Sequence, residues 1–300
     1  MKVIVAGGTG LIGKALTKSL VSDGHDVVIL TRGTNSDSVS HVTYARWDGR
    51  TTGEWVSHID GADAVVNLTG ENLSSGLWTK ARKQEILNCR VDAGKAITEA
   101  IQQAAKKPSV LVQSSGVGFY GTRQSDLLAE DAPSGDDFLA HVSREWEAST
   151  QPVEAMGVRR VVIRTAVVLS NKGGALDRLL LPFKLFVGGP LGSGKQWMSW
   201  IHMKDQVRAI CFLIENPAAS GAFNLSAEPV TNHEFSRITG KIMKRPAFIR
   251  VPAFALRLLL GEMSTVVLDG QRVSAEKLTR LGFKFDYPDL DSALVNLLKY

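Results

Sequence analysis

Three glycines near the N-terminus have the spacing that could bind a phosphate group. Gly7, Gly10 and Gly13 follow an apolar run, Lys2–Ala6, and precede an amphipathic segment. This order is typical of a buried strand, a tight turn and the start of a helix. In such a turn the glycines permit a sharp bend, close approach to a pyrophosphate and close packing of helix on strand. Because the first N–H groups of a helix are free, the turn predicts a dinucleotide site, with a purely structural turn as the alternative.

A basic residue follows the next predicted strand. The apolar run Val27–Leu30 is followed by Thr31 and Arg32. In nucleotide-binding folds of this type, an acidic residue here binds both ribose hydroxyls of NAD, whereas an arginine accommodates the 2′-phosphate of NADP. Arg32 therefore favours NADP as the cofactor, with a solvated loop arginine as the alternative.

Three more predicted strands end in residues that could contact a ligand. They cover residues 42–48, 62–71 and 110–113. Asp48 could meet an adenine amino group, or it could only begin the turn that follows. Gly70 permits close approach of the backbone to a ligand. Ser114-Ser115-Gly116 follows the last of these strands.

Strand and helix patterns alternate through the first half of the chain. Helical spacing of apolar residues begins near Leu11 and recurs over residues 77–106 and 138–155. Because parallel neighbours need helical crossovers, this alternation predicts an α/β fold with a Rossmann-type, doubly wound parallel sheet. The pattern changes after Leu169. We therefore predict an NADP-binding domain over residues 1–169 and a smaller, mixed substrate lobe over 170–300, with later segments returning to the sheet.

Composition narrows the class of partner. The net charge is +5, and no run of five basic residues indicates a nucleic-acid site. Cys89 and Cys211 form no spaced pair, which argues against a disulfide framework and a metal site. No window reaches the ~18 apolar residues of a membrane span, and no signal peptide is visible. We expect a cytoplasmic protein with a small-molecule substrate and neither a nucleic-acid nor a membrane partner; an oligomer is left open.

One glycine-rich segment partly matches the sequence pattern of an ATP-binding P-loop. Residues Gly189 to Lys195 fit the first seven positions of a P-loop, G-x-x-x-x-G-K. The next residue should be a Ser or Thr that holds magnesium, but it is Gln196, and no helical spacing follows it. We therefore predict a substrate-facing loop rather than an ATP site, in which Lys195 could contact a phosphate.

Together with three further motifs, these features resemble the short-chain dehydrogenase/reductase superfamily. The motifs are Asn67–Gly70, Ser114–Gly121 and Trp200–Asp205. Specifically, the chain is similar to the extended, NAD(P)-dependent epimerase/dehydratase branch, and within it to an uncharacterised epimerase-like group with its own C-terminal segment. The resemblance covers the whole chain and implies a Rossmann domain, an NADP-type cofactor and a small C-terminal substrate lobe.

The same resemblance implies which residues contact each ligand. It places the cofactor against Gly7, Thr9, Gly10, Leu11, Ile12, Gly13, Arg32, Asp48, Leu68, Gly70, Glu71 and Ser114. It places the substrate against Lys195, Gln196 and His202. His202 and Asp205 resemble the family's His-x-x-Asp element, with hydrogen bonding between the lobes and helix capping as the plainer interpretation.

The family's catalytic pair is missing from the chain. Established members use a Tyr-x-x-x-Lys helix, in which the tyrosine is the acid/base and the lysine lowers its pKa, and a serine completes the set. Ser115 is the candidate serine, while counting back from Tyr120 gives Gly116 as the alternative. In the corresponding helix the tyrosine and lysine positions fall on Leu139 and Ser143.

Hydride transfer still needs a proton acceptor for the substrate hydroxyl, because a free alkoxide is too high in energy. Tyr120 and His141 are the available substitutes, and for His141 we favour a solvated helix position. We therefore take Ser115 and Tyr120 as the candidate catalytic residues of an NADP-dependent oxidoreductase, with packing in a turn as the alternative for Tyr120. Its substrate would be sugar-nucleotide-like or another small hydroxyl or carbonyl compound. The alternative is an NADP-binding sensor or partner-binding protein without turnover.

Overall fold

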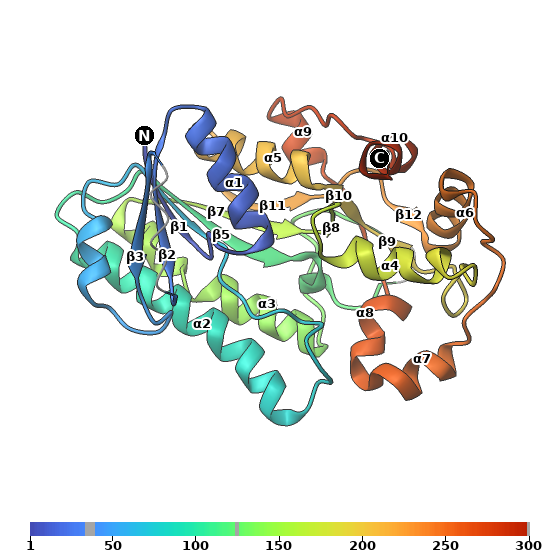
Figure 1. Ribbon diagram of the computed structural model, residues 1–300. Coiled ribbons are helices and arrows are strands. Elements are labelled where there is room, and N and C mark those ends of the chain that lie inside the picture. Colours follow the sequence, from blue (N-terminus) through green and yellow to red (C-terminus); the bar gives the residue numbers. More distant parts are fainter. Residues whose placement is uncertain (34–39, 124–125, 299–300) are drawn as a thin grey trace.

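A parallel sheet of seven strands forms the centre of the computed structural model, which describes residues 1–33, 40–123 and 126–298 (Figure 1). The strand order is β3-β2-β1-β4-β5-β7-β11, and all neighbouring strands run parallel. The bounds are β1 Lys2–Ala6, β2 Asp26–Thr31, β3 Val42–Arg46, β4 Ala64–Asn67, β5 Val110–Gly116, β7 Arg159–Thr165 and β11 Gly221–Leu225. The order reverses between β1 and β4, where such sheets bind ligands beyond the carboxyl ends of the strands. The predicted Rossmann-type fold is confirmed.

Helices cover both faces of this sheet, which explains why its strands are apolar throughout. In β1, Val3 and Val5 face one core, whereas Ile4 and Ala6 face the other. The first core lies under α1 (Leu11–Ser22) and α5 (Met203–Glu215), and the second lies over α2 (Lys80–Gln103). Figure 1 shows α1 and α5 above the sheet, and α2 with α3 (Phe138–Ala148) below it.

Two of the predicted helices are shorter than their apolar patterns. The helix expected over 77–106 begins at Lys80, because the Thr79 side chain accepts a hydrogen bond from the N–H of Arg82 and caps it. The helix expected over 138–155 ends at Ala148, and a short 3-10 helix over Gln151–Met156 follows. Pro152 lies at the start of that second helix, where its missing N–H costs nothing.

The second half of the chain adds a smaller mixed unit and also rejoins the sheet through α5 and β11. Three short strand pairs, β8 with β10, β9 with β12 and β6 with β13, connect its segments. Their bounds are β6 Leu127–Leu128, β8 Val167–Leu169, β9 Trp197–Met198, β10 Trp200–His202, β12 Val230–Thr231 and β13 Arg272–Val273. The helices are α4 Ala175–Lys184, α6 Asn232–Met243, α7 Ala253–Leu260, α8 Thr265–Leu268, α9 Glu276–Arg280 and α10 Leu290–Leu298.

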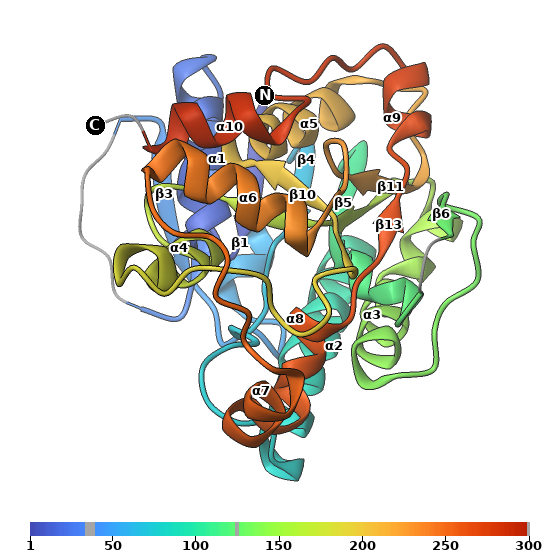
Figure 2. The same cartoon turned by 90° about the vertical axis from the view of Figure 1, so that its right-hand side faces the viewer.

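A separate apolar core holds this unit together, with Trp200, Phe235 and Leu294 among its buried members. Thr231 and Glu234 form a capping box at the start of α6, with Thr at the N-cap and Glu three residues later. Seen from the side, α7 and α8 lie at the lower part of the molecule, below α4 and α6 (Figure 2). Within the described ranges, no helix combines the length and the apolar character needed to cross a membrane.

Candidate functional site

Close backbone contacts shape the glycine turn between β1 and α1. Gly7 has a φ of 79°, and a Cβ at this position would lie 2.8 Å from the carbonyl oxygen of Leu68. A Cβ at Gly13 would overlap the carbonyl oxygen of Gly7. Glycine is therefore required at both positions. No side chain in the described chain caps α1 at Gly10, and the first turn has no acidic residue. Its leading N–H groups can therefore receive an anion.

A charged cluster lies beside this turn, at the ends of β2 and β4. The Arg32 side chain is 72% exposed, and its guanidinium lies 3.3 Å from the carboxylate of Glu71. Arg82 approaches the same carboxylate at 3.6 Å. Glu71, predicted as a cofactor contact, is thus an acid held between two arginines.

Gly70 makes room for a protein side chain that sequence reasoning missed. A Cβ at Gly70 would lie 2.9 Å from the guanidinium of Arg90, a buried residue of α2. Arg90 donates a hydrogen bond of 2.9 Å to the carbonyl oxygen of Glu71. It also lines the cavity described below. The close approach expected at Gly70 is therefore one between backbone and Arg90.

Asp48 shapes the turn after β3. Its carboxylate accepts hydrogen bonds from the Thr51 hydroxyl and from the backbone N–H groups of Thr51 and Arg50, at 2.7 to 2.8 Å. These bonds, that of the hydroxyl foremost, hold the pKa of Asp48 down to about 2. Asp48 therefore holds the turn, and its contact with an adenine amino group stays a prediction.

The remaining predicted cofactor residues lie at the same edge of the sheet. Thr9 is exposed in the turn, and Leu11 and Ile12 are half-buried in the first turn of α1. Leu68 follows β4 and packs against the turn, and Ser114 is buried near the end of β5. The structure therefore gathers residues that are far apart in sequence around the carboxyl ends of β1, β4 and β5.

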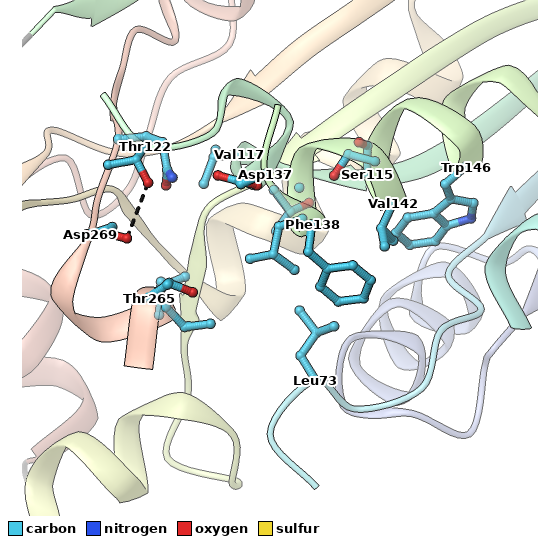
Figure 3. Close-up of a pocket in the computed structure, with 18 of the residues that line it drawn as sticks. Leu73, Ser115, Val117, Thr122, Asp137, Phe138, Val142, Trp146, Thr265 and Asp269 are labelled. Carbon is cyan, nitrogen blue, oxygen red and sulfur yellow. Dashed lines mark hydrogen bonds between the residues drawn. The ribbon is translucent and has the colours of Figure 1, made fainter. Parts of the chain in front are cut away.

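A cavity with a volume of about 560 Å³ opens beyond the ends of β5 and β7 (Figure 3). Most of its wall is apolar, from Leu73, Trp78, Val117, Phe138, Leu139, Val142, Trp146, Ala166, Val167 and Val266. The segment after α7 closes the far side, where the Asp269 carboxylate accepts a hydrogen bond from the Thr122 hydroxyl at 3.3 Å. Lys83 of α2 and Glu262 form an ion pair across the same opening. Residues from both halves of the chain therefore enclose one chamber.

Ser115 lies in the cavity wall and is hydrogen-bonded to a carboxylate behind it. Its hydroxyl donates to Oε1 of Glu147, from α3, at 2.6 Å. Arg164 clamps the same carboxylate, with Nε to Oε1 and Nη2 to Oε2 both at 3.0 Å. Arg164 reaches it because β7 pairs with β5 in the register that sets Arg164 beside Ser115. Only 13% of the Glu147 side chain and 6% of the Arg164 side chain is exposed. We call Ser115, Glu147 and Arg164 the proton site.

Tyr120 is not brought to the cavity, contrary to its prediction as a catalytic residue. It is fully buried, its hydroxyl donates to Oδ1 of Asn224 at 2.7 Å, and Nη1 of Arg164 donates to that hydroxyl at 3.0 Å. Burial raises the pKa of Tyr120 against the opposing effect of Arg164, so the hydroxyl stays neutral. Both of its hydrogen bonds would have to break before it could swing into the chamber.

The helix that carries the family's catalytic pair presents different side chains here. Leu139 and Ser143, at the tyrosine and lysine positions, both line the cavity. Leu139 has no proton to exchange. His141 lies on the solvent side, 4.0 Å from the Glu145 carboxylate, and is not part of the cavity wall. This agrees with the solvated position favoured for it.

The three predicted substrate residues do not line this cavity. Lys195 is exposed in its loop, and the amide of Gln196 donates to the carbonyl oxygens of Leu191 and Val267, which ties that loop to α8. His202 is buried and caps α5 by accepting from the N–H of Lys204 at 3.0 Å. Burial lowers the pKa of His202, which keeps the imidazole neutral for this role. The side chains of Gln196 and His202 therefore stabilise the fold, whereas that of Lys195 is exposed.

The fold and the glycine turn together define a dinucleotide-binding α/β protein of the Rossmann class. Residues 3–226 match the NAD dependent epimerase/dehydratase family, and residues 251–297 match a domain of unknown function, DUF1731. The chain belongs to the NAD dependent epimerase/dehydratase family. The match confirms the resemblance found in the sequence, and it confirms a nicotinamide dinucleotide as the cofactor type of the family.

Relatives of similar length support this assignment. Epimerase family protein YfhF of Bacillus subtilis is 39% identical, over 99% of this chain and 98% of its own. A chloroplastic SDR39U1 homologue of Arabidopsis thaliana is also 39% identical, over 98% of this chain and 86% of its own. The crystal structure of human epimerase family protein SDR39U1, determined with NADPH, superposes with a TM-score of 0.90 at 33% identity and covers 99% of both chains.

Sequence reasoning missed the two residues that complete the proton site. Arg164 ends the apolar run Val161–Ile163, and Glu147 lies in the helix that begins at Phe138. A signal was present, because a charged residue at the end of an otherwise apolar strand needs a partner when it is buried. The residues that face the cavity from the segment after α7 had no such signal, because only the tertiary fold brings them there.

Proposed function

We propose that this protein is an NADP-dependent oxidoreductase of the epimerase/dehydratase type. Its substrate would be a small hydroxyl or carbonyl compound, sugar-nucleotide-like or other, held in the cavity beside Ser115. The hydrogen bond of 2.6 Å from Ser115 to Glu147 carries this proposal, because it gives a proton acceptor to a site without the tyrosine and lysine.

The residues around the glycine turn fit the cofactor. Gly7 and Gly13 let the turn and α1 pack closely, Gly10 leaves room for a pyrophosphate at the free N–H groups of α1, and the exposed Arg32 fits a 2′-phosphate. The NADPH bound by the human relative supports the choice of NADP. When bound, the nicotinamide would supply the hydride acceptor or donor, and proton transfer is left to the residues of the cavity.

Ser115 can pass a proton from the cavity to Glu147. Its O–H points to the carboxylate, so its lone pairs are free to accept a hydrogen bond from a substrate hydroxyl. As that hydroxyl becomes a carbonyl, its proton would move to the Ser115 oxygen, and the proton of Ser115 would move to Glu147. The reverse transfer would protonate the oxygen of a carbonyl substrate during reduction.

Arg164 holds this arrangement in place. Burial is the largest single influence and opposes its charge, but the hydrogen bonds and charge of Glu147, together with the contribution of Tyr120, outweigh burial and raise the pKa of Arg164. The two-point contact fixes the carboxylate plane, so that Oε1 faces Ser115. Tyr120 supports the clamp from behind through its hydroxyl. We assign Arg164 and Tyr120 as positioning residues and Ser115 and Glu147 as catalytic residues.

The test compares two variants that break the relay at different points. Glu147→Gln removes the terminal base but leaves the buried Arg164 charge unpaired, which endangers folding. Ser115→Ala removes the relay hydroxyl and keeps the ion pair. We expect both to slow deuteride transfer from deuterated NADPH to a panel of aldehydes, ketones and sugar nucleotides by about 10²- to 10⁴-fold. Their affinity for NADPH, measured by fluorescence, should stay close to that of the unaltered protein.

Glu145→Gln is the matched control, because Glu145 lies on the solvent side of the same helix. It should leave turnover unchanged. Full turnover in folded Ser115→Ala would contradict the relay.

A second candidate function is an NADP-binding sensor without turnover, and Leu139 at the tyrosine position is the observation that favours it. Tight NADPH binding by the unaltered protein, with no deuteride transfer to any member of the panel, would favour the sensor over the oxidoreductase.

A further inference from the structure

One stretch of the second half combines positive charge with apolar side chains. Between Phe235 and Gly261 the chain has six basic residues and no acidic one. The basic residues are Arg237, Lys241, Lys244, Arg245, Arg250 and Arg257, and all six are exposed. None of them forms an ion pair with a carboxylate in the part of the chain that the structure describes. Their charge is therefore available to an outside partner.

Large apolar side chains are exposed on the same stretch. Phe248 is 79% exposed and Leu258 is 87% exposed, and Phe254 and Leu259 are nearly as open. No residue of α7 is buried. Phe254, Arg257 and Leu258 have the i, i+3, i+4 spacing that places them on one side of that helix. An isolated exposed leucine needs no explanation, but a helix that is apolar and unburied along its length does.

The end of α4 extends this surface. The backbone N–H of Ile249 donates to the carbonyl oxygen of Gly188 at 3.1 Å, which joins the two segments. The guanidinium of Arg245 lies over the ring of Phe186, 4.1 Å from its centroid. Phe186 and its neighbour Leu185 are themselves exposed. We call the exposed side chains of residues 185–187 and 237–259 the basic–apolar face.

We propose that the basic–apolar face docks on the surface of an anionic lipid bilayer. Phenylalanine and leucine side chains insert at the level of the headgroups, while arginine and lysine contact the lipid phosphates and extend their alkyl stems along the apolar surface. Each basic residue that reaches an anionic surface strengthens binding about fivefold. The face meets both requirements, because Arg257 lies on α7 among exposed apolar side chains, Arg250 precedes that helix, and Lys241, Lys244 and Arg245 lie near the exposed Phe248.

The shape of this region favours a bilayer over a protein or nucleic-acid partner. In both views α7 lies at the lower end of the molecule, away from the sheet, with the start of α2 reaching lower still (Figure 1 and Figure 2). A projecting apolar helix can enter a fluid surface without a matching groove. Docking would leave the protein outside the hydrocarbon core. The inference departs from the sequence-based expectation of no membrane partner, which depended on the absence of a spanning segment.

Docking would also bring one wall of the cavity close to the lipid. Glu262, Thr265 and Val266, which line the cavity, follow directly after α7. A bilayer that holds α7 would therefore lie beside the segment that closes the chamber. The docking proposal itself does not depend on the proposed oxidoreductase activity.

Co-sedimentation with large vesicles tests the proposal on the full chain. We expect the protein to pellet with phosphatidylcholine vesicles that contain phosphatidylglycerol, and not with phosphatidylcholine alone. Binding should weaken as salt is raised, because the charges lie at the surface. The double variant Arg250→Glu/Arg257→Glu should bind at least about tenfold more weakly, because two attractions become repulsions. Leu258→Asp should lose binding to a similar degree, because it places a charge where the helix inserts.

Matched controls separate this face from general effects of charge and surface. Lys18→Glu/Lys106→Glu reverses two exposed lysines elsewhere on the chain, and Leu127→Asp replaces an exposed leucine outside the face. Both should retain binding. Thermal unfolding of each variant checks the fold. No pelleting with anionic vesicles would overturn the proposal, and so would equal loss in the control variants. A dimer in solution that Leu258→Asp dissociates, without any vesicle binding, would instead assign the face to a second copy.

Discussion

The glycine turn and the proton site lie at the same edge of one sheet, yet they differ in how they follow the family pattern. The turn keeps all three glycines, and two of them are required by backbone contacts. Beside the proton site, the cavity wall has Leu139 and Ser143 at the positions of the tyrosine and lysine in the family pattern. Backbone recognition of a phosphate allows few residue types at fixed spacing. A proton acceptor can come from any element near the reacting atom, and in the proposed mechanism α3 supplies it from Glu147.

The largest effect should come from a change at the glycine turn. A Cβ at Gly10 would meet the carbonyl oxygen of Gly7 at 3.2 Å, a tight contact that requires a small shift of the turn, so thermal unfolding of Gly10→Val is measured beside its binding. The valine side chain fills the space that a pyrophosphate needs beside α1. We expect NADPH affinity, measured by fluorescence titration, to fall by about 100-fold or more, a change of about 2.7 kcal/mol.

Gly53→Ala serves as the control for this substitution. Its Cβ would make only ordinary contacts with Trp55, at 3.7 Å, away from the turn. It should bind NADPH as the unaltered protein does. Unchanged NADPH affinity in Gly10→Val would show that the glycine turn has only a structural role. The glycine turn would then no longer differ from the proton site in keeping the function of the family pattern.

The parts of the structure that could be predicted from sequence are those set by local pattern. Apolar runs predicted β1 to β5 of the central sheet, and helical spacing predicted α1, α2 and α3. Side chains that meet across elements could not be predicted in this way. The contact between Ser115 and Glu147 spans 32 residues of sequence, and nothing local to either residue specifies it.

Tyr120 and His202, both predicted as site residues, are buried and do not line the cavity. Tyr120 and His202 are residue types that often do chemistry, and both stand next to motif residues. Burial decides their roles instead, because a buried hydroxyl or imidazole must find a hydrogen-bond partner. Tyr120 finds Asn224, and His202 finds the first turn of α5. Sequence position alone does not distinguish a side chain that lines a cavity from one packed behind it.

A smaller effect is expected at Arg32, where a side chain rather than the backbone would recognise the cofactor. Arg32→Asp replaces an exposed cation with an anion next to Glu71. We expect NADPH affinity to fall by about tenfold to 100-fold, because a charge-assisted contact is lost and a repulsion is added. NADH lacks the 2′-phosphate, so its affinity should hardly change and provides the internal control. Equal affinity of the unaltered protein for NADPH and NADH would contradict this role of Arg32.

The smallest effect on chemistry is expected at Tyr120, which the structure places behind the proton site. Tyr120→Phe deletes two buried hydrogen bonds, to Asn224 and from Arg164. We expect the free energy of unfolding in urea to fall by about 1–3 kcal/mol, because two buried groups lose a partner. Turnover per folded molecule should change by about twofold or less, since Glu147 keeps both of its contacts with Arg164.

Tyr44→Phe is the matched control, because the Tyr44 hydroxyl on β3 forms no hydrogen bond with the described part of the chain. It should change the free energy of unfolding by less than about 0.5 kcal/mol. If Tyr120→Phe instead keeps its stability and loses most of its turnover, Tyr120 belongs to the catalytic set. A tyrosine would then handle the proton, as in the family pattern. It would come from the segment after β5 and not from α3, where Leu139 stands at the tyrosine position.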